Sequence, residues 1–181
     1  MKKLILITVV AFLSSATIFA QGAVAMKNGG SGANGNVNAP VLGTDGVTKL
    51  SGASFTAELL FGANANSLSP VGSTVVFNTG ALVGFFAANP TYTLPGFGIG
   101  STVTLQVRAW NNTTGSSYAS ATTRGSSVAF NVVLGDPLNP ASLPVLAGMN
   151  SFSLSTVPVP EPATYALLGL GALGFAIRRR K

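Results

Sequence analysis

Cysteine and histidine are both absent from this chain of 181 residues. Without cysteine the protein can form no disulfide, no thiol nucleophile and no iron–sulfur ligand set. Without histidine it lacks the commonest general base of enzymes and the commonest zinc ligand. Catalysis would have to rest on carboxylates, and the whole chain has only four Asp and Glu residues. We therefore expect no catalytic residues, no cofactor and no metal centre of the usual kinds.

Charge is scarce too, and most of it lies at the two ends of the chain. The formal net charge is +6, but two basic residues, Lys2 and Lys3, open the chain and four close it at 178–181. The part between them, residues 26–157, has four basic and three acidic residues (4 − 3 = +1). Such scattered charges cannot make the clustered phosphate contacts of a nucleic-acid binder, so no nucleic-acid partner is expected. Little repulsion remains between copies, which makes self-association plausible.

The N-terminus has the parts of a secretory signal peptide. Lys2 and Lys3 are followed by an apolar stretch at residues 4–12 and by an A-x-A cleavage signature at Ala23 and Ala25. We predict a signal-peptide helix within residues 1–25, export through the Sec translocon and cleavage after Ala25. Two alternatives stay open: cleavage after Ala20, which puts Ile18 at the −3 position, and an uncleaved N-terminal helix.

The C-terminus also has three parts. A Pro-Glu-Pro triplet precedes an apolar run at residues 163–177, and a basic cluster ends the chain. As a helix the run spans only ~22 Å, so it would cross a bilayer by thinning it or by snorkelling of its basic end. The basic end would stay cytoplasmic by the positive-inside rule.

This tail, residues 157–181, resembles the PEP-CTERM sorting signal. The resemblance implies recognition of the triplet by exosortase, a membrane-embedded transpeptidase-like enzyme, with the helix as a transient inner-membrane anchor and the basic cluster as a stop-transfer signal. An ordinary anchor that is never processed is the alternative. The residues assigned to the triplet, the helix and the basic end are, in turn, Pro160, Glu161 and Pro162; Ala163, Leu167, Leu168, Leu170, Leu173, Phe175 and Ile177; and Arg178, Arg179, Arg180 and Lys181.

The middle of the chain alternates in the manner of β-strands. We predict strands at 55–61, 73–77, 81–86, 102–110, 127–134 and 152–154, with a turn cluster at 95–100 and a short helix as one reading of 118–123. In the strand 102–110 the odd-numbered residues are expected to face inward. The pattern predicts an all-β fold, a single small β-sandwich (Ig-like or jelly-roll-like) over 39–156, preceded by a flexible Gly/Asn-rich segment at 26–38.

Few side chains in this domain suit catalysis or ligand binding. A glycosidase would need paired carboxylates, but Asp45 and Asp136 occupy turn sequences and Glu58 is expected to face outward. Calcium binding at Asp45 or Asp136 stays open. The glycines at 96, 98 and 100 lack the lysine of a phosphate loop and indicate a turn.

Aromatic residues and sequons leave further alternatives open. Trp110, Tyr92 and Tyr118 could stack on sugar rings or pack in the core or at an edge. Asn111 and Asn112 begin two overlapping N-x-[ST] sequons, which reflect either glycosylation or loop composition.

Together these features predict an exported, non-enzymatic surface or extracellular-matrix protein. Its association with exopolysaccharide is implied by the family resemblance. A carbohydrate-binding or adhesive module is the second hypothesis, and a hydrolase that depends on Glu58 is the third.

Overall fold

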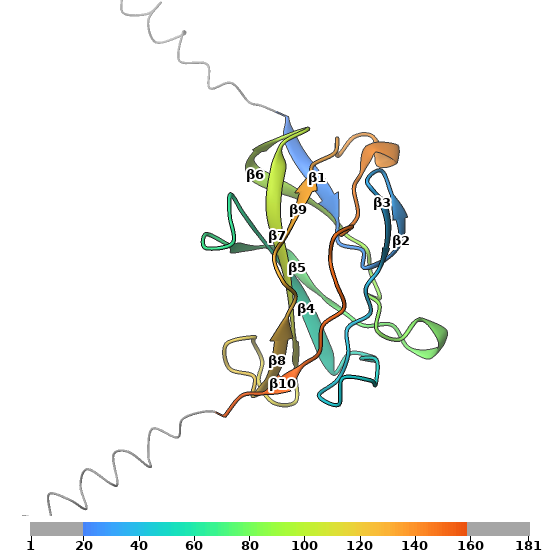
Figure 1. The fold of residues 1–181 in the computed structure, drawn as a ribbon, viewed down its shortest axis with the longest axis vertical. Coiled ribbons are helices and arrows are strands. Elements are labelled where there is room, and N and C mark those ends of the chain that lie inside the picture. The colour runs from blue at the N-terminus through green and yellow to red at the C-terminus, as the bar shows by residue number, and fades with distance from the viewer. Residues whose placement is uncertain (1–19, 159–181) are drawn as a thin grey trace, which may run out of the picture.

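The computed structural model describes residues 20–158 (Figure 1), and its regular structure is mostly β-strand. The helical elements within this range are two single 3₁₀ turns, η1 (Gly80–Leu82) and η2 (Pro140–Ser142). The prediction of an all-β fold is confirmed. No helix among the described residues is long and apolar enough to span a membrane, and the helices predicted within 1–25 and at 163–177 lie outside this range, apart from the last residues of the first.

Six antiparallel strands form the main sheet, whose central strand is β7 (Thr102–Asn111). On β7, Val103, Leu105, Val107 and Ala109 are buried, as the sequence pattern predicted. The strand order is β10-β8-β7-β4-β5, with β9 pairing with β7 beyond β8. The bounds of the other strands are β4 (Phe55–Gly62), β5 (Ser69–Val76), β8 (Thr123–Ser126), β9 (Phe130–Val133) and β10 (Ser155–Thr156).

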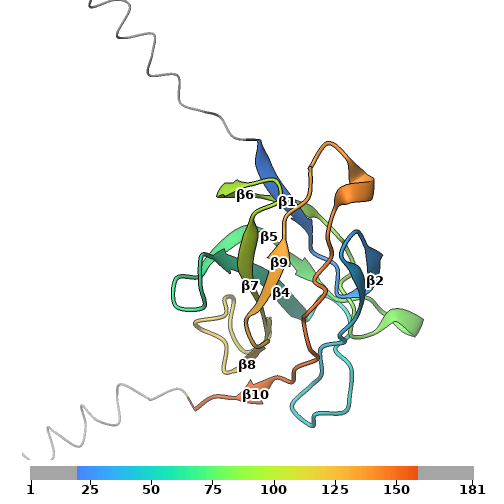
Figure 2. The same ribbon diagram turned by 45° about the horizontal axis from the view of Figure 1, so that its top comes forward.

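A second, less regular layer covers the inner face of this sheet. It contains the antiparallel pair β1 (Gln21–Ala25) and β6 (Thr91–Gly98) and the hairpin of β2 (Gly29–Gly32) and β3 (Gly35–Asn38). Figures 1 and 2 place β1 and β6 at one end of the domain and β8 and β10 at the other. Both layers contribute to one apolar core, which includes Met26, Leu59, Leu94, Leu105 and Leu146.

Two predicted irregular segments are strands instead. Residues 26–38, expected to be flexible, contain buried Met26 and Asn28 and continue into the β2–β3 hairpin. The predicted turn at 95–100 overlaps the end of β6, where Gly98 pairs with Gln21. In both places glycine, asparagine or proline concealed the strands, and the partner of β6 is also distant in the sequence.

The reverse error occurs at residues 81–86, which were expected to form a strand. Here η1 and a single bridge between Phe77 and Phe86 replace it. Positive φ angles at Gly80 and Gly84, +67° and +86°, interrupt the extended backbone. Residues 118–123 form turns that lead into β8, so the short helix does not form.

The outer edge of the main sheet is strand β5. Pro70 removes one N–H from this edge, and Gly72, at φ +68°, lies within an irregularity of the pairing between β5 and β4. Proline and bulges are common devices against edge-to-edge pairing of sheets. Strand β5 is therefore a poor site for the self-association that the low charge of the surface made plausible.

Candidate functional site

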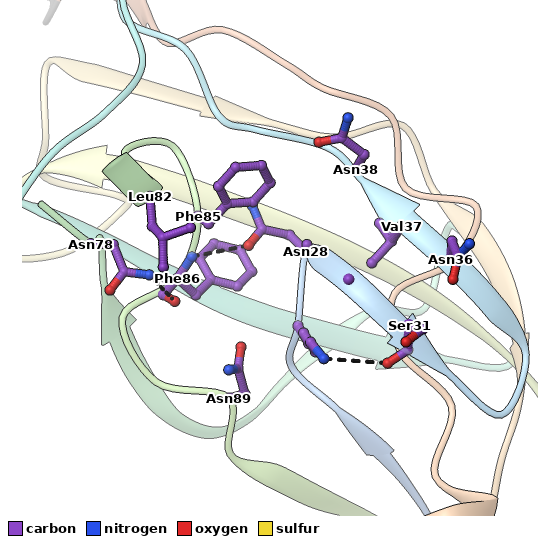
Figure 3. Close-up of a pocket in the computed structure, with 13 residues that line it drawn as sticks. Asn28, Ser31, Asn36, Val37, Asn38, Asn78, Leu82, Phe85, Phe86 and Asn89 are labelled. Carbon is purple, nitrogen blue, oxygen red and sulfur yellow. Dashed lines mark hydrogen bonds between the residues drawn. The ribbon is translucent and has the colours of Figure 1, made fainter. Parts of the chain in front are cut away.

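A cleft lies between the β2–β3 hairpin and the loop of residues 78–89 (Figure 3). Its volume is about 670 Å³, and we call it the amide cleft because asparagine side chains recur around it. The hairpin side contributes Asn36 and Asn38, and the loop contributes Asn78 and Asn89. Asn36, Asn38 and Asn89 are exposed, so their amides are open to solvent.

Asn28 holds the two sides of the amide cleft together from below. Asn28 is only 1% exposed, and both polar atoms of its side-chain amide form hydrogen bonds within the protein. Nδ2 donates to the carbonyls of Ala39 (2.9 Å) and Gly84 (3.0 Å), and Oδ1 accepts the N–H of Phe86 (3.0 Å). A buried amide satisfied in this way fixes the geometry of the segments that it joins.

An apolar surface accompanies the amides. The half-buried ring of Phe85 and the side chain of Leu82, which is 59% exposed, line the amide cleft on the loop side. Gly29 permits the hairpin to approach this ring, because a Cβ at Gly29 would lie 2.6 Å from a carbon of Phe85.

Lys27 lines the amide cleft, Lys49 lies near its Phe85 ring, and no carboxylate of the described residues lines it. Lys27 Nζ donates to the carbonyl of Ser31 (3.3 Å), and Lys49 Nζ lies 5.9 Å from the centre of the Phe85 ring. Within residues 20–158 the ion pair that forms is Arg108–Glu58, which involves neither lysine. Lys27 is therefore the charged side chain that lines the amide cleft.

Trp110 and Tyr92 are buried, which favours packing over sugar stacking, the two interpretations left open for them. Trp110 is 4% exposed and packs edge to face on Tyr118, with ring centres 6.4 Å apart. Its Nε1 has no hydrogen-bond partner among the described residues. The Tyr92 ring lies under Gly72, and its hydroxyl donates to the Ser73 carbonyl.

Tyr118 is engaged by two guanidinium groups. Arg108 Cζ lies 4.8 Å and Arg124 Cζ 5.2 Å from the centre of its ring. Arg124 Nη1 also donates to the backbone carbonyls of Tyr118 and Ala119, at 2.6 and 2.8 Å. These contacts attach the 112–122 loop to the outer face of the main sheet, so Tyr118 acts in packing rather than as a free platform.

The three candidate carboxylates occupy three separate environments. Glu58 faces outward and pairs with Arg108. Asp45 accepts hydrogen bonds from the Thr48 hydroxyl and from the N–H groups of Val47 and Thr48, and these lower its pKa. Asp136 accepts the N–H of Leu138 in its own turn. The described residues hold no cluster of three or more Asp and Glu that could bind a metal ion.

The two sequon asparagines have intramolecular partners. Asn111 Oδ1 accepts from the N–H and the hydroxyl of Thr113. Asn112 Nδ2 donates to the Ala53 carbonyl (3.0 Å) and to Thr56 Oγ1 (2.6 Å). A glycan on Asn112 would disrupt these bonds, which favours loop composition as the origin of the sequons.

The predicted signal-cleavage residues lie inside strand β1. Ala23 is fully buried and exchanges two backbone hydrogen bonds with Gly135, at 2.9 and 3.0 Å. Ala25 N–H donates to the Pro144 carbonyl (2.9 Å). Cleavage after Ala25 would remove the whole of β1 and open the core, so the structure argues against that site.

The sorting residues at 160–181 lie outside the described part of the chain. The residues just before them are described and are held by hydrogen bonds to the domain. β10 pairs with β8, and the N–H of Val157 donates to the Thr122 carbonyl at 2.7 Å. A family model described as the PEP-CTERM protein-sorting motif matches residues 158–181. The chain carries a PEP-CTERM sorting motif.

This motif confirms the resemblance drawn from the C-terminal residues. A PEP-CTERM motif indicates an exported protein that is anchored in the membrane before it is processed, with exosortase as the processing partner. Neither the curated proteins nor the solved structures searched gave a match to this chain.

The sequence alone did not reveal the amide cleft. Its walls come from residues 27–38 and 78–89, and the sequence predicted a flexible segment for the first and a strand at 81–86 within the second. A local signal existed, because both segments are rich in asparagine. What brings them together is Asn28, whose partners Gly84 and Phe86 are more than fifty residues away.

Proposed function

We propose that this protein is a non-enzymatic component of the cell surface or extracellular matrix, associated with exopolysaccharide. Export through the Sec translocon and exosortase processing near Pro160–Pro162 would deliver it there. The PEP-CTERM motif carries the proposal. The structure adds that the folded domain extends to Val157, directly before the motif, so that one irregular β-sandwich would make up the released protein.

We also propose that signal peptidase cuts after Ala20. Ala20 is exposed and immediately precedes β1, whereas a cut after Ala25 would destroy the β1–β6 pair. Ile18 would then occupy the −3 position, and the mature chain would begin at Gln21.

Intact mass spectrometry of the protein recovered from its native envelope and from the medium tests both statements. The expected mass is that of a mature chain that begins at Gln21 and lacks the apolar run and the basic end. A mature protein that retains residues 163–181 would show that the tail is only an anchor. A mature protein that begins at Met26 would overturn the Ala20 site and leave the sorting assignment intact.

The carbohydrate-binding hypothesis remains as a second candidate, but at a different site. Trp110 and Tyr92 are inaccessible, whereas the amide cleft presents polar and apolar groups to solvent. The third candidate, a hydrolase, has no support in the surroundings of Glu58, whose carboxylate is paired with Arg108.

A further inference from the structure

We propose that the amide cleft binds a segment of an acidic polysaccharide, one that contains uronic acid residues. The proposal rests on the proposed function in that it names the class of polysaccharide with which the exported protein would associate. It is argued from the side chains around the cleft.

The amides define the first part of the ligand's chemistry. A carboxamide offers two N–H donors and a carbonyl acceptor, which matches a hydroxyl group that both donates and accepts. Figure 3 shows Asn36 and Asn38 on the hairpin side and Asn78 and Asn89 on the loop side of the amide cleft. Asn78 already donates to the Phe86 carbonyl at 2.9 Å, which leaves the three exposed amides for the hydroxyl groups of a ligand.

Phe85 and Leu82 supply the apolar complement. A sugar ring has a face of C–H groups between its hydroxyls, and such a ligand requires a few polar contacts beside an apolar one. The half-buried ring of Phe85 lies between the amides of the two sides. This mixture suits a polyol better than a purely apolar ligand.

The lysines select for a negative charge on that ligand. Lys27 and Lys49 are two of the four basic side chains of the described domain. The other two are held in structural contacts, because Arg108 pairs with Glu58 and Arg124 binds the carbonyls of Tyr118 and Ala119. Lys27 donates only to the Ser31 carbonyl, in an exposed hydrogen bond. With no carboxylate lining the amide cleft, a carboxylate brought by the ligand would meet the ammonium group of Lys27, and charge-assisted bonds are the stronger kind. Lys49, beside the Phe85 ring, adds a second positive charge nearby.

The amide cleft is also preorganised. The Asn28 bonds to Ala39, Gly84 and Phe86 hold its floor in place, so that little ordering of the backbone is needed on binding. A preformed site retains affinity that a flexible one would lose to entropy.

The test measures binding of the exported, mature protein to two defined oligosaccharides, an oligogalacturonate and a neutral maltooligosaccharide of equal length, by titration calorimetry. We expect binding of the acidic oligosaccharide that weakens as salt is added and at least about tenfold weaker binding of the neutral one. The variant K27Q/K49Q should lose the preference, whereas K27R/K49R should retain most of it because the charges remain.

A pair of asparagine variants separates the amide cleft from the rest of the surface. N38A/N89A should weaken binding about tenfold, and N66A, in the exposed turn between β4 and β5, should not change it. Unchanged melting temperatures would show that each variant is folded. Binding that is equal for both oligosaccharides, absent altogether, or unaffected by the cleft variants would overturn the proposal. The mass of the mature protein tests export and sorting independently of all three outcomes.

Discussion

The side-chain carbonyl of Asn28 accepts the backbone N–H of Phe86, 58 residues further along the chain. This bond and the one that Asn28 donates to Gly84 connect the start of the β2–β3 hairpin to the loop that follows β5, and the bond to Ala39 joins the two ends of the hairpin. They are made by a side chain that is almost fully buried, so water cannot replace them if they are lost.

The variant N28A should therefore be strongly destabilised. It leaves the Phe86 N–H and the carbonyls of Ala39 and Gly84 without partners, and the free energy of unfolding should fall by about 3 kcal/mol. Urea denaturation followed by circular dichroism measures this change. N38A, at an exposed position ten residues away, is the matched control and should shift stability by less than about 0.5 kcal/mol. Equal effects of the two substitutions would refute the role given to Asn28.

Tyr118 should protect the single tryptophan of the chain from water. Removal of its ring in Y118A would uncover Trp110 and abolish the contacts with Arg108 and Arg124. We expect a red shift of the tryptophan fluorescence and a loss of about 2 kcal/mol of stability. Y118F retains the ring and should behave like the wild type. An unshifted emission spectrum in folded Y118A would contradict this packing.

Stability should decline in alkaline solution partly because of Tyr92. Burial raises the pKa of Tyr92 above its ordinary value near 10, although the side chain of Ser73 opposes this shift. Because the folded-state pKa is the higher one, the stabilisation is complete below the unfolded pKa and is lost as pH rises through the folded pKa. Between pH 9 and 11 (roughly, from the ordinary tyrosine pKa), melting temperatures should fall more for the wild type than for Y92F. Parallel curves would show that Tyr92 makes no contribution.

Glu58 is expected to stabilise the sheet without acting in catalysis. E58Q removes one charge of the partly exposed pair with Arg108 and should lower the free energy of unfolding by about 1 kcal/mol. R108Q should have a larger effect, because Arg108 also contacts Tyr118. A hydrolytic activity of the wild-type protein on polysaccharide that disappears in folded E58Q would overturn the non-enzymatic proposal.

Local patterns in the sequence predicted the centre of the fold but not its second layer. The alternation of apolar and polar residues in β7 is strong because one face of the main sheet is buried. In β4 it is weaker, since the adjacent residues Leu59 and Leu60 are both buried. By contrast, β1 consists of small residues, including the Ala23–Ala25 pair that also satisfies signal peptidase. One short segment thus satisfies two patterns, and only its partners β6 and Gly135 reveal which one applies.

The amide cleft was beyond sequence reasoning for a related reason. β2 and β3 have the sequences GGSG and GNVN, whose composition is typical of a flexible linker. Their order depends on pairing with each other and on Asn28, a contact with no local signature. The turns of Asp45 and Asp136 were predictable, because an aspartate that accepts the N–H two residues ahead is a local arrangement.

The bond between Val157 and Thr122 also limits the distance between the folded domain and the membrane before the protein is released. Five residues, 158–162, separate it from the apolar run, and a fully extended chain of that length reaches at most ~18 Å. In a chain anchored by the proposed tail helix, the β8–β10 end would therefore lie near the lipid headgroups. The end formed by β1 and β6 is at the opposite end of the domain (Figure 1), so it would be the part of the anchored protein that lies farther from the membrane.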